Sequence, residues 1–294
     1  MNSISVVPGM ASLAERYDGF IVDLWGVIHD GERLYPGVAE TLQNLKKAGK
    51  PVCLLSNAPR RVLALEAGLE AMGIPRSLYD YVMCSGEAVH TELLKRTDPW
   101  FAALGYRCYH LGPMRDENLF EGLNLQRVGM EDADFVLNTG LYEFEDTVDT
   151  YMDVLVAARE RSLPMLCANP DIVIVRRGQL ICCAGAVAER YKLMGGEVVY
   201  RGKPDPAIYI PCLELLGISD RRRVAAVGDS FATDIAGAAA ARIDSILVAG
   251  GIHAEELGLP PENPDRLLPD PARVMAACHK RALSPVAAIP AFVW

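Results

Sequence analysis

The sequence predicts an α/β protein: a doubly wound, Rossmann-like parallel sheet with a second α/β domain inserted into it. Along most of the chain, short apolar runs of strand length alternate with amphipathic stretches of helix length, as in a parallel sheet covered by helices. The pattern changes in the middle of the chain, where one apolar run is predicted to fold back as a hairpin. Polar residues follow several other runs, where the carboxyl ends of parallel strands lie.

The first part of the predicted core contains two strands, 19–23 and 51–55, and two helices, 38–48 and 60–72. Each strand is a continuous apolar run, which is typical of a strand covered on both faces. The first helix carries Leu42 and Leu45 on one face, and Gly49 follows its last turn as a stop signal. These elements predict the first two strand–helix units of the sheet.

We expect the inserted domain at 99–196, between core segments at 1–98 and 197–294. Its predicted elements are strands at 106–111, 135–139 and 165–168, a helix at 147–161, and a hairpin at 172–182 that turns at Arg177-Gly178.

The last part of the predicted core contains strands at 198–200, 223–227 and 244–248 and a helix at 236–241. A further helix is expected to open at Asp205-Pro206, because Asp is a favoured N-cap and Pro suits the first helical position.

The composition excludes several classes of protein. The chain has 294 residues, with 29 Lys and Arg against 38 Asp and Glu, and a formal net charge of −9. This acidic balance argues against a protein that binds nucleic acid by neutralising phosphates. No apolar run reaches the roughly 18 residues of a membrane-spanning helix, and the first residues do not resemble a signal peptide. We therefore expect a cytoplasmic protein with neither nucleic acid nor membrane as a partner.

The eight cysteines show neither a CxxC pair nor the spacing of a disulfide framework. Several lie inside apolar runs, where a free thiol behaves as a small hydrophobic group. The five histidines lack zinc-site spacing. We expect reduced core cysteines, as in cytosolic proteins, and no zinc.

Polar groups gather at the predicted carboxyl ends of the core strands. Because these ends converge on one crevice of an open parallel sheet, they are expected to form one site. Carboxylates suit Mg²⁺, and an ammonium group with hydroxyl or amide donors suits a phosphate. The residues are Asp23, Ser56, Asn57, Lys203, Asp229 and Asp234.

Four motifs resemble those of the haloacid dehalogenase-like hydrolases in order and context. They are Asp23-Leu-Trp-Gly-Val, Ser56-Asn57, Gly202-Lys203-Pro204 and Gly228-Asp-Ser-Phe-Ala-Thr-Asp234. The run from Asp23 to Gly31, with Asn169-Pro-Asp171, resembles class IIA, whose large C2-type α/β cap is inserted between the second and third motifs. That class includes nucleotide and pyridoxal phosphate phosphatases. The resemblance covers nearly the whole chain and implies an aspartyl-phosphate intermediate with Mg²⁺ as cofactor.

The resemblance also implies the role of each residue. Asp23 would be the nucleophile and a metal ligand, and Lys203 would balance charge between Asp23 and the phosphate. Ser56 and Asn57 would hydrogen-bond the transferring phosphoryl group.

The remaining metal ligands follow in the same way. Asp229 would bind Mg²⁺ directly, and Trp25 would contribute its backbone carbonyl. Asp234 would hold the ion's waters or orient Asp229; the alternative for Asp234 is a charge favoured by a helix N-terminus.

Trp25 departs from the family pattern, which places a second Asp two residues after the nucleophile as general acid and base. An indole cannot transfer a proton at ordinary pH, and such catalysis is typically worth about 10²–10⁴-fold. His29 and Asp30 lie close along the chain as substitutes. The Trp25 side chain would either pack in the core or cover the substrate.

Other positions stay open between two interpretations. Asn169 and Asp171 either contact substrate or form an Asx turn before the hairpin. Arg176-Arg177 is either a solvated hairpin tip or a site for a substrate anion. The apolar tail Ile289–Trp294 either covers a partner subunit, as in a homo-oligomer, or packs on its own core.

We therefore expect a Mg²⁺-dependent phosphatase of a small phosphorylated metabolite. Trp25 motivates two alternatives: a protein that binds a phosphometabolite or regulates without catalysis, and a slow hydrolase or phosphotransferase.

Overall fold

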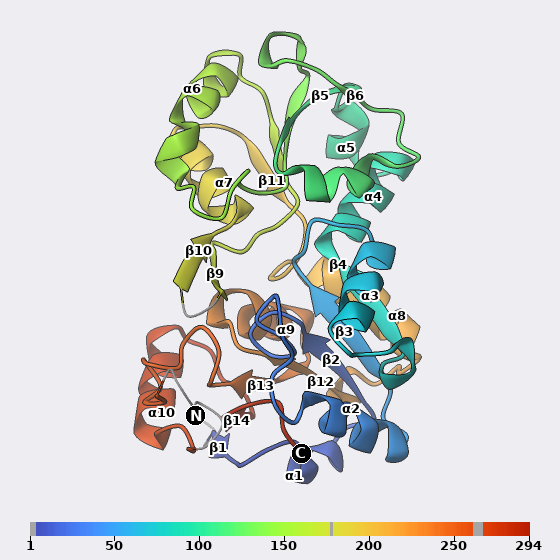
Figure 1. Ribbon diagram of the computed structural model, residues 1–294, viewed down its shortest axis with the longest axis vertical. Helices are drawn as coiled ribbons and strands as arrows, with labels where there is room; N and C mark the ends of the chain where they lie inside the picture. The colour runs from blue at the N-terminus through green and yellow to red at the C-terminus, as the bar shows by residue number, and fades with distance from the viewer. Residues whose placement is uncertain (1–3, 177–178, 261–266) are drawn as a thin grey trace.

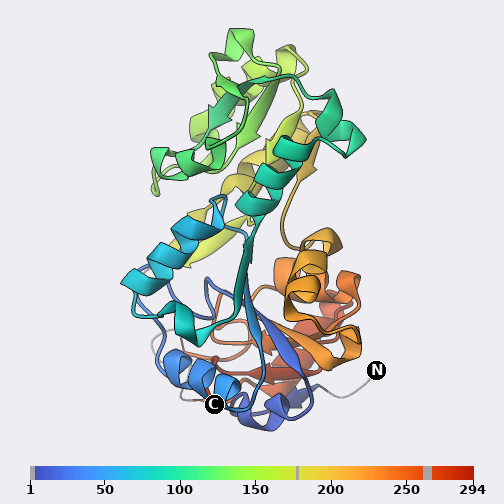
Figure 2. The same ribbon diagram turned by 90° about the vertical axis from the view of Figure 1, so that its right-hand side faces the viewer.

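The structure, a computed structural model, describes residues 4–176, 179–260 and 267–294, and it has two units stacked along the long axis (Figure 1). The core unit forms the lower half of the view, and the cap unit forms the upper half. The chain leaves the core through helix α4 (Ser85–Lys95) and returns through strand β11 (Val198–Tyr200) (Figure 2). Within the described residues, no helix has the length and apolar character needed to cross a membrane.

A seven-stranded parallel sheet organises the core, with the order β1-β14-β13-β12-β2-β3-β4. Its strands are β1 (Ser5–Val6), β2 (Gly19–Asp23), β3 (Val52–Ser56), β4 (Tyr81–Cys84), β12 (Val224–Gly228), β13 (Asp244–Val248) and β14 (Ala287–Ile289). From β2 the chain runs outward to β3 and β4, and it later returns to β12 on the other side of β2. The order therefore reverses between β2 and β12, where open α/β sheets bind their ligands.

Helices cover both faces of the core sheet because successive residues of a buried strand point to opposite faces. Phe20 and Val22 pack in a cluster with Leu42 of α2, whereas Ile21 packs on the other face with Cys212 of α8. The helices of this unit, besides α4, are α1 (Ala11–Ala14), α2 (Val38–Lys47), α3 (Val62–Ala71), α8 (Tyr209–Leu216), α9 (Ala236–Ala241) and α10 (Pro271–Lys280).

The cap unit contains a five-stranded parallel sheet with the order β11-β8-β7-β5-β6. Besides β11, its strands are β5 (Arg107–Leu111), β6 (Gln126–Arg127), β7 (Phe135–Asn138) and β8 (Met165–Cys167), and its helices are α5 (Pro99–Ala103), α6 (Met152–Glu160) and α7 (Ala184–Leu193). A separate antiparallel pair, β9 (Val173–Arg176) and β10 (Gln179–Cys182), lies between this sheet and the core (Figure 1). The α/β fold with an inserted α/β cap is as predicted.

One predicted strand lies in a different sheet from the one expected. Residues 198–200 were expected in the second half of the core, but Val198 pairs with Met165 of β8 at the edge of the cap sheet. The placement in the core is therefore wrong for this strand, because a run of three apolar residues fits the edge of either sheet equally well. The predicted limits of the inserted domain, at 98/99 and 196/197, stay predictions. The predicted hairpin turn at Arg177-Gly178 lies outside the described residues.

Candidate active site

The structure brings the predicted polar residues together at the carboxyl edge of the core sheet. Asp23 is the last residue of β2, Ser56 the last of β3, and Asp229 directly follows β12. A short π-helical turn, Phe231–Ile235, carries Asp234 back beside Asp229. The carboxylates of Asp23, Asp229 and Asp234 each offer an oxygen within 4.8 Å of the others. These three groups are the kind of donor set that suits a hard divalent cation.

Lys203 lies at the centre of this cluster, and its side chain is only 3 % exposed. Its Nζ donates hydrogen bonds to Asp23 Oδ1 at 2.5 Å and to Asp234 Oδ1 at 2.7 Å. Burial alone would lower the pKa of Lys203, but the carboxylates of Asp23 and Asp234 raise it well above its usual value. The side chain is therefore a fixed positive charge that partly offsets two buried carboxylates.

The three carboxylates nevertheless carry more negative charge than Lys203 can offset. Burial, followed by the charge of Asp234, raises the pKa of Asp23 well above its usual value. The same causes raise the pKa of Asp229 to about 7. Close like charges and low solvation both oppose ionisation. A divalent cation would relieve this repulsion, which is a second reason why the cluster fits a metal.

Close backbone contacts hold Asp229 in place. Ile252 N donates to Asp229 Oδ2 at 2.8 Å. Gly26 has φ of +85°, and a Cβ there would lie 2.1 Å from the same oxygen; a Cβ at Gly251 would lie 2.0 Å from it. The loops after β2 and β13 therefore need glycine at these positions so that their backbones can approach the carboxylate.

Asp234 is held in a similar way by its own turn. Ser230 N donates to Asp234 Oδ2 at 3.1 Å, and Ser230 Oγ accepts from Thr233 N at 3.3 Å. The first bond directs one carboxylate oxygen toward its own backbone, and the other oxygen accepts from Lys203. The roles predicted for Asp234, to hold the ion's waters or to orient Asp229, stay predictions.

Ser56 and Asn57 lie beside Asp23, but their side chains are used differently. Ser56 Oγ accepts from Ala58 N at 3.1 Å, which leaves the hydroxyl hydrogen available to donate. Asn57 Oδ1 accepts from Lys203 N at 2.7 Å, while its Nδ2 donates to Lys203 O and to Asp171 Oδ1. Both hydrogens of the Asn57 amide are therefore engaged. Its side chain joins the second and third motifs, and donation to a phosphoryl group would require one of these bonds to break.

Of the two interpretations for the predicted cap residues, the structure shows the Asx turn, and contact with substrate stays a prediction. Asn169 Oδ1 accepts from Asp171 N at 3.0 Å, which is an Asx turn. Asp171 accepts from Asn57 Nδ2 at 2.9 Å and lines the same cavity as Asp23. Burial raises the pKa of Asp171 above its usual value. Asn169 thus shapes the loop, and Asp171 brings the cap into contact with the second motif.

Trp25 joins the core to the cap. Its Nε1 donates to Val175 O in β9 at 2.7 Å, across 150 residues of sequence. Its ring packs edge-on against His29, with ring centroids 5.6 Å apart. The side chain therefore neither lies inside the core nor stands free as a lid. Its backbone carbonyl as a metal ligand stays a prediction.

His29 and Asp30 do not offer the missing acid. Burial lowers the pKa of His29 to about 4, and its Nδ1 accepts from Gly31 N at 3.0 Å. The Asp30 carboxylate accepts from Glu32 N and Arg33 N, and these backbone N–H groups hold its pKa below the usual value despite some burial. Both side chains stabilise their own loop. At neutral pH His29 is neutral and Asp30 is ionised.

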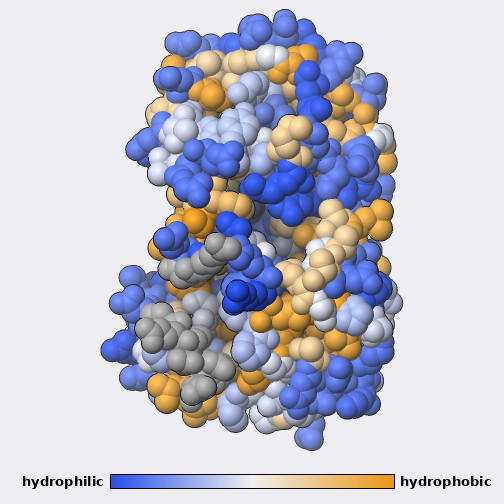
Figure 3. Space-filling model, in the orientation of Figure 1, coloured by the Kyte–Doolittle hydropathy of each residue, from blue (hydrophilic) through white to orange (hydrophobic). Residues whose placement is uncertain are grey.

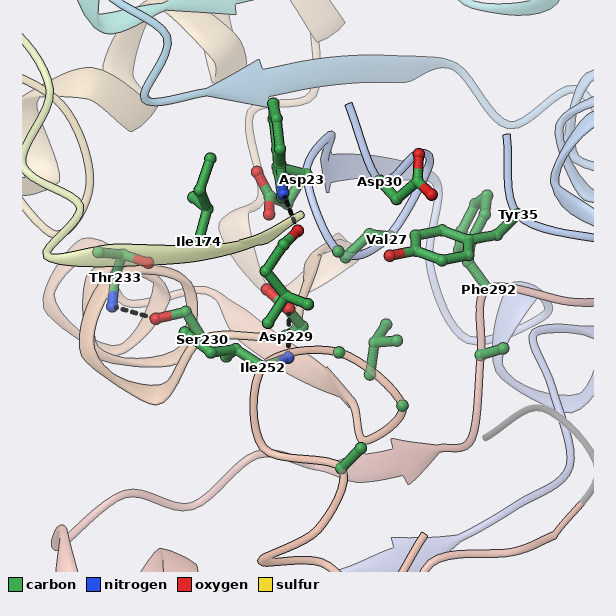
Figure 4. A pocket seen from close by; sticks show the side chains of 18 of the residues that line it. Asp23, Val27, Asp30, Tyr35, Ile174, Asp229, Ser230, Thr233, Ile252 and Phe292 are labelled. Carbon is green, nitrogen blue, oxygen red and sulfur yellow. Dashed lines mark hydrogen bonds between the residues drawn. The ribbon is translucent and has the colours of Figure 1, made fainter. Parts of the chain in front are cut away.

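A cavity of about 780 Å³ lies in front of the carboxylates, and Figure 4 shows it from close by. The site residues that line it are Asp23, Ser56, Asn57, Lys203 and Asp229. Hairpin residues, among them Ile174 and Leu180, also line the cavity. Tyr35 and Phe292 line it too, and in the view of Figure 4 they lie together to one side of Asp23 and Asp229. On the molecular surface, this face is hollowed between cap and core, with strongly hydrophilic side chains beside the hollow (Figure 3).

Sequence reasoning missed two residues that line this cavity, Tyr35 and Phe292. Tyr35 lies in a loop with no motif, and Phe292 follows the short strand β14 in a tail with two open interpretations. Phe292 is 1 % exposed and packs in the main core cluster. No local pattern marks either residue. Only the position of β14 beside β13 brings the tail to the site.

Comparisons with known proteins agree with the motifs. One family model, described as haloacid dehalogenase-like hydrolase, matches residues 20–126, and a second, described as HAD-hydrolase-like, matches residues 200–273. An acid sugar phosphatase of Staphylococcus saprophyticus is 27 % identical over 82 % of this chain and 90 % of its own length. The ribonucleotide monophosphatase NagD of Escherichia coli K12 is 26 % identical over 86 % of this chain and 96 % of its own length.

The comparison of structures covers the whole chain. The crystal structure of a hydrolase of the haloacid dehalogenase-like family from Brucella suis 1330 is 32 % identical in sequence. It superposes with a TM-score of 0.83 over 98 % of this chain and 100 % of the other. Together with the two matched segments and the inserted α/β cap, this places the chain in the haloacid dehalogenase-like hydrolases, in the class with a C2-type cap, as its motifs predicted.

Proposed function

We propose that this enzyme is a Mg²⁺-dependent phosphatase that transfers the phosphoryl group of a small metabolite to Asp23 and then to water. The observation that carries the proposal is the position of the Lys203 ammonium group between the carboxylates of Asp23 and Asp234, with Asp229 alongside. The two relatives described above are named as phosphatases, which supports the same reaction.

In the first step an Asp23 carboxylate oxygen attacks phosphorus, and the bond from phosphorus to the leaving-group oxygen breaks. Lys203 and the Ser56 hydroxyl face the charge that develops on the phosphoryl oxygens. Asp23, Asp229 and Asp234 would hold Mg²⁺, which supplies positive charge for the phosphoryl group. In the second step water cleaves the acyl phosphate, which releases inorganic phosphate and regenerates the Asp23 carboxylate.

Among the residues that the structure describes, the proposed site lacks an evident side chain to protonate the leaving group. Trp25 stands where the family has its acid, and His29 and Asp30 are held in their own loop. The leaving oxygen must then take its proton from solvent. Substrates whose leaving group has a low pKa, such as a phenol or a carboxylic acid, lose least from a missing acid, so we propose these as the preferred phosphate esters and anhydrides.

The proposals for the substrate class and for the location draw on the relatives. Their names point to sugar phosphates and ribonucleoside monophosphates, and the cavity of about 780 Å³ accommodates a metabolite of that size. We propose a small phosphorylated metabolite as the substrate and the cytoplasm as the location.

Trp25 also supports a second candidate function: a protein that binds a phosphometabolite, or turns it over slowly, while its aspartyl phosphate accumulates. A panel of aryl, alkyl and acyl phosphates, assayed for phosphate release with Mg²⁺, separates the candidates. We expect release from the members with acidic leaving groups, and none from Asp23→Asn. Binding of phosphate with Mg²⁺ but no release from any member would favour the second candidate and refute the first.

A further inference from the structure

In the described part of the chain, the cap hairpin has no backbone pairing with a larger sheet that could hold it over the active site. Strands β9 and β10 pair with each other and belong to neither large sheet. All the described residues of the two strands are at least partly exposed. An isolated two-stranded hairpin is only marginally stable in water. Its position therefore depends on individual contacts with the core.

Two polar contacts between described residues join the core to β9. Trp25 Nε1 donates to Val175 O at 2.7 Å, and the Arg176 guanidinium pairs with Glu32 Oε1 at 2.8 Å. Both core residues belong to the loop that follows the nucleophile Asp23. The hairpin is thus fastened directly to the catalytic loop.

The indole is itself held rigidly. His29 packs edge-on against its ring, and a Cβ at Gly31 would lie 2.2 Å from the Trp25 ring. Gly31 has φ of +93°, so glycine meets both the backbone and the packing requirement there. The direction of the Trp25 N–H bond is therefore set before any ligand binds.

We infer that Trp25 is a positioning residue that fastens the cap hairpin over Asp23, and that the apolar wall it holds selects substrates with an apolar leaving group. We call the two contacts of Trp25 with Val175 and of Glu32 with Arg176 the clasp. The selection of substrates rests on the proposed function, but the clasp does not. The hairpin contributes Val173, Ile174, Val175 and Leu180 to the cavity. Val27 and Phe292 of the core line the same cavity, and Figure 4 shows Ile174 and Val27 on either side of Asp23 in that view.

This clasp gives Trp25 a role at the position where the family pattern predicts Asp. A carboxylate at position 25 has no N–H to donate to the Val175 carbonyl. With an indole at position 25, the chain loses proton transfer there, and the apolar wall of the cavity is held in place instead. Ordering such a wall in advance favours ligands that bury apolar surface against it, since the cost of ordering is met before binding.

The test compares Trp25→Phe with the matched control Trp100→Phe. Each variant removes one indole hydrogen bond, because Trp100 Nε1 donates to Glu197 Oε1 at 2.5 Å within the cap, away from the hairpin. Hydrogen exchange is measured at residues 173–176 and 179–182. We expect exchange there to be about tenfold faster in Trp25→Phe and unchanged in Trp100→Phe. Equal exchange in wild type and Trp25→Phe would overturn the clasp.

Ligand selection is tested by binding, so that turnover is not required. The ligands are benzylphosphonate and inorganic phosphate, each with Mg²⁺. In Trp25→Phe we expect the Kd of benzylphosphonate to rise about tenfold and that of phosphate to change less than about twofold. Equal weakening of both ligands would overturn the selection. A wild-type protein that shows this pattern but releases no phosphate would refute the proposed function and leave the inference standing.

A second variant covers the case in which Trp25→Phe does not fold. Glu32→Gln removes the charge that pairs with Arg176, and Glu256→Gln, at the core ion pair with Arg281, is its control. We expect Glu32→Gln to raise exchange in the hairpin and the Kd of benzylphosphonate in the same direction, by a smaller factor. No change in either quantity would count against the clasp.

Discussion

Lys203 Nζ lies 2.5 Å from Asp23 Oδ1, although 180 residues separate them in the chain. The segment between them includes the whole cap, and Lys203 comes directly after the chain returns from it. The same nitrogen lies 2.7 Å from Asp234 Oδ1. The return of the chain from the cap therefore places the Lys203 cation between two of the three carboxylates of the site.

Replacing Lys203 should destabilise the protein as well as inactivate it. In Lys203→Met two buried carboxylates lose their cation, which typically costs about 3–5 kcal/mol. Urea unfolding should show this loss, and Lys47→Met, at an exposed position of α2, should show almost none. The double variant Asp23→Asn with Lys203→Met should recover part of the stability, because one unpaired carboxylate is gone. An unchanged unfolding midpoint in Lys203→Met would contradict the role of Lys203 in offsetting these two carboxylates.

Metal binding should depend on pH through Asp229. In the metal-free protein the pKa of this carboxyl is raised from 3.8 to about 7. The folded state then binds more protons than the unfolded state between these values, so this group makes the free energy of unfolding fall as pH rises. Because Mg²⁺ binds the ionised form, its stabilising effect should grow up to about pH 7 and then level off.

Thermal unfolding with EDTA and with Mg²⁺, between about pH 5 and about pH 8, checks this dependence. Asp229→Asn is the control and should lose most of the Mg²⁺ effect at every pH. A stabilisation by Mg²⁺ that is the same across this range would refute the assignment of Asp229.

Restoring an acid at position 25 should change which leaving groups are tolerated. Trp25→Asp supplies a proton donor, and Trp25→Asn has nearly the same size with no proton to give. Both variants lose the indole contact with Val175, so their comparison isolates proton transfer. For alkyl phosphates we expect kcat to be about 10²-fold higher in Trp25→Asp than in Trp25→Asn, with little difference for nitrophenyl phosphate. Equal rates for both classes would show that position 25 is not within reach of the leaving oxygen.

Asp171 should act as a hydrogen-bond acceptor for Asn57. Its carboxylate accepts from Asn57 Nδ2 at 2.9 Å. In Asp171→Asn the amide oxygen still accepts this bond, so kcat/KM should stay close to the wild-type value. In Asp171→Ala the bond is lost and the second motif loosens, which should lower kcat/KM by up to about a hundredfold. If Asp171→Asn is as impaired as Asp171→Ala, the charge or proton of Asp171 matters instead.

Local sequence signals predicted much of the fold and the gathering of the site. The runs that form β2, β3 and β12 are continuous and apolar, and the polar residue at or just after the end of each marks the carboxyl edge of the sheet. Because parallel strands share that edge, Asp23, Ser56 and Asp229 had to converge.

The sequence alone could not predict which residues far apart in the chain contact one another. Val198–Tyr200 carries no local mark of which sheet it joins, and β14 is only three residues long. The contact of Trp25 with the Val175 backbone carbonyl spans 150 residues, and a backbone acceptor leaves no trace in residue type. The engagement of the Asn57 amide was hidden for a similar reason, since one of its partners is the backbone of Lys203.

The most direct test of the site is rapid quenching of the enzyme with a substrate labelled at phosphorus, in the presence of Mg²⁺. The result we expect is acid-stable, base-labile label on a single peptide that contains Asp23, formed before or together with the release of product, and no label on Asp23→Asn. Turnover of substrate without any label on the protein, or label that persists in Asp23→Asn, would contradict the assignment of Asp23 as the nucleophile.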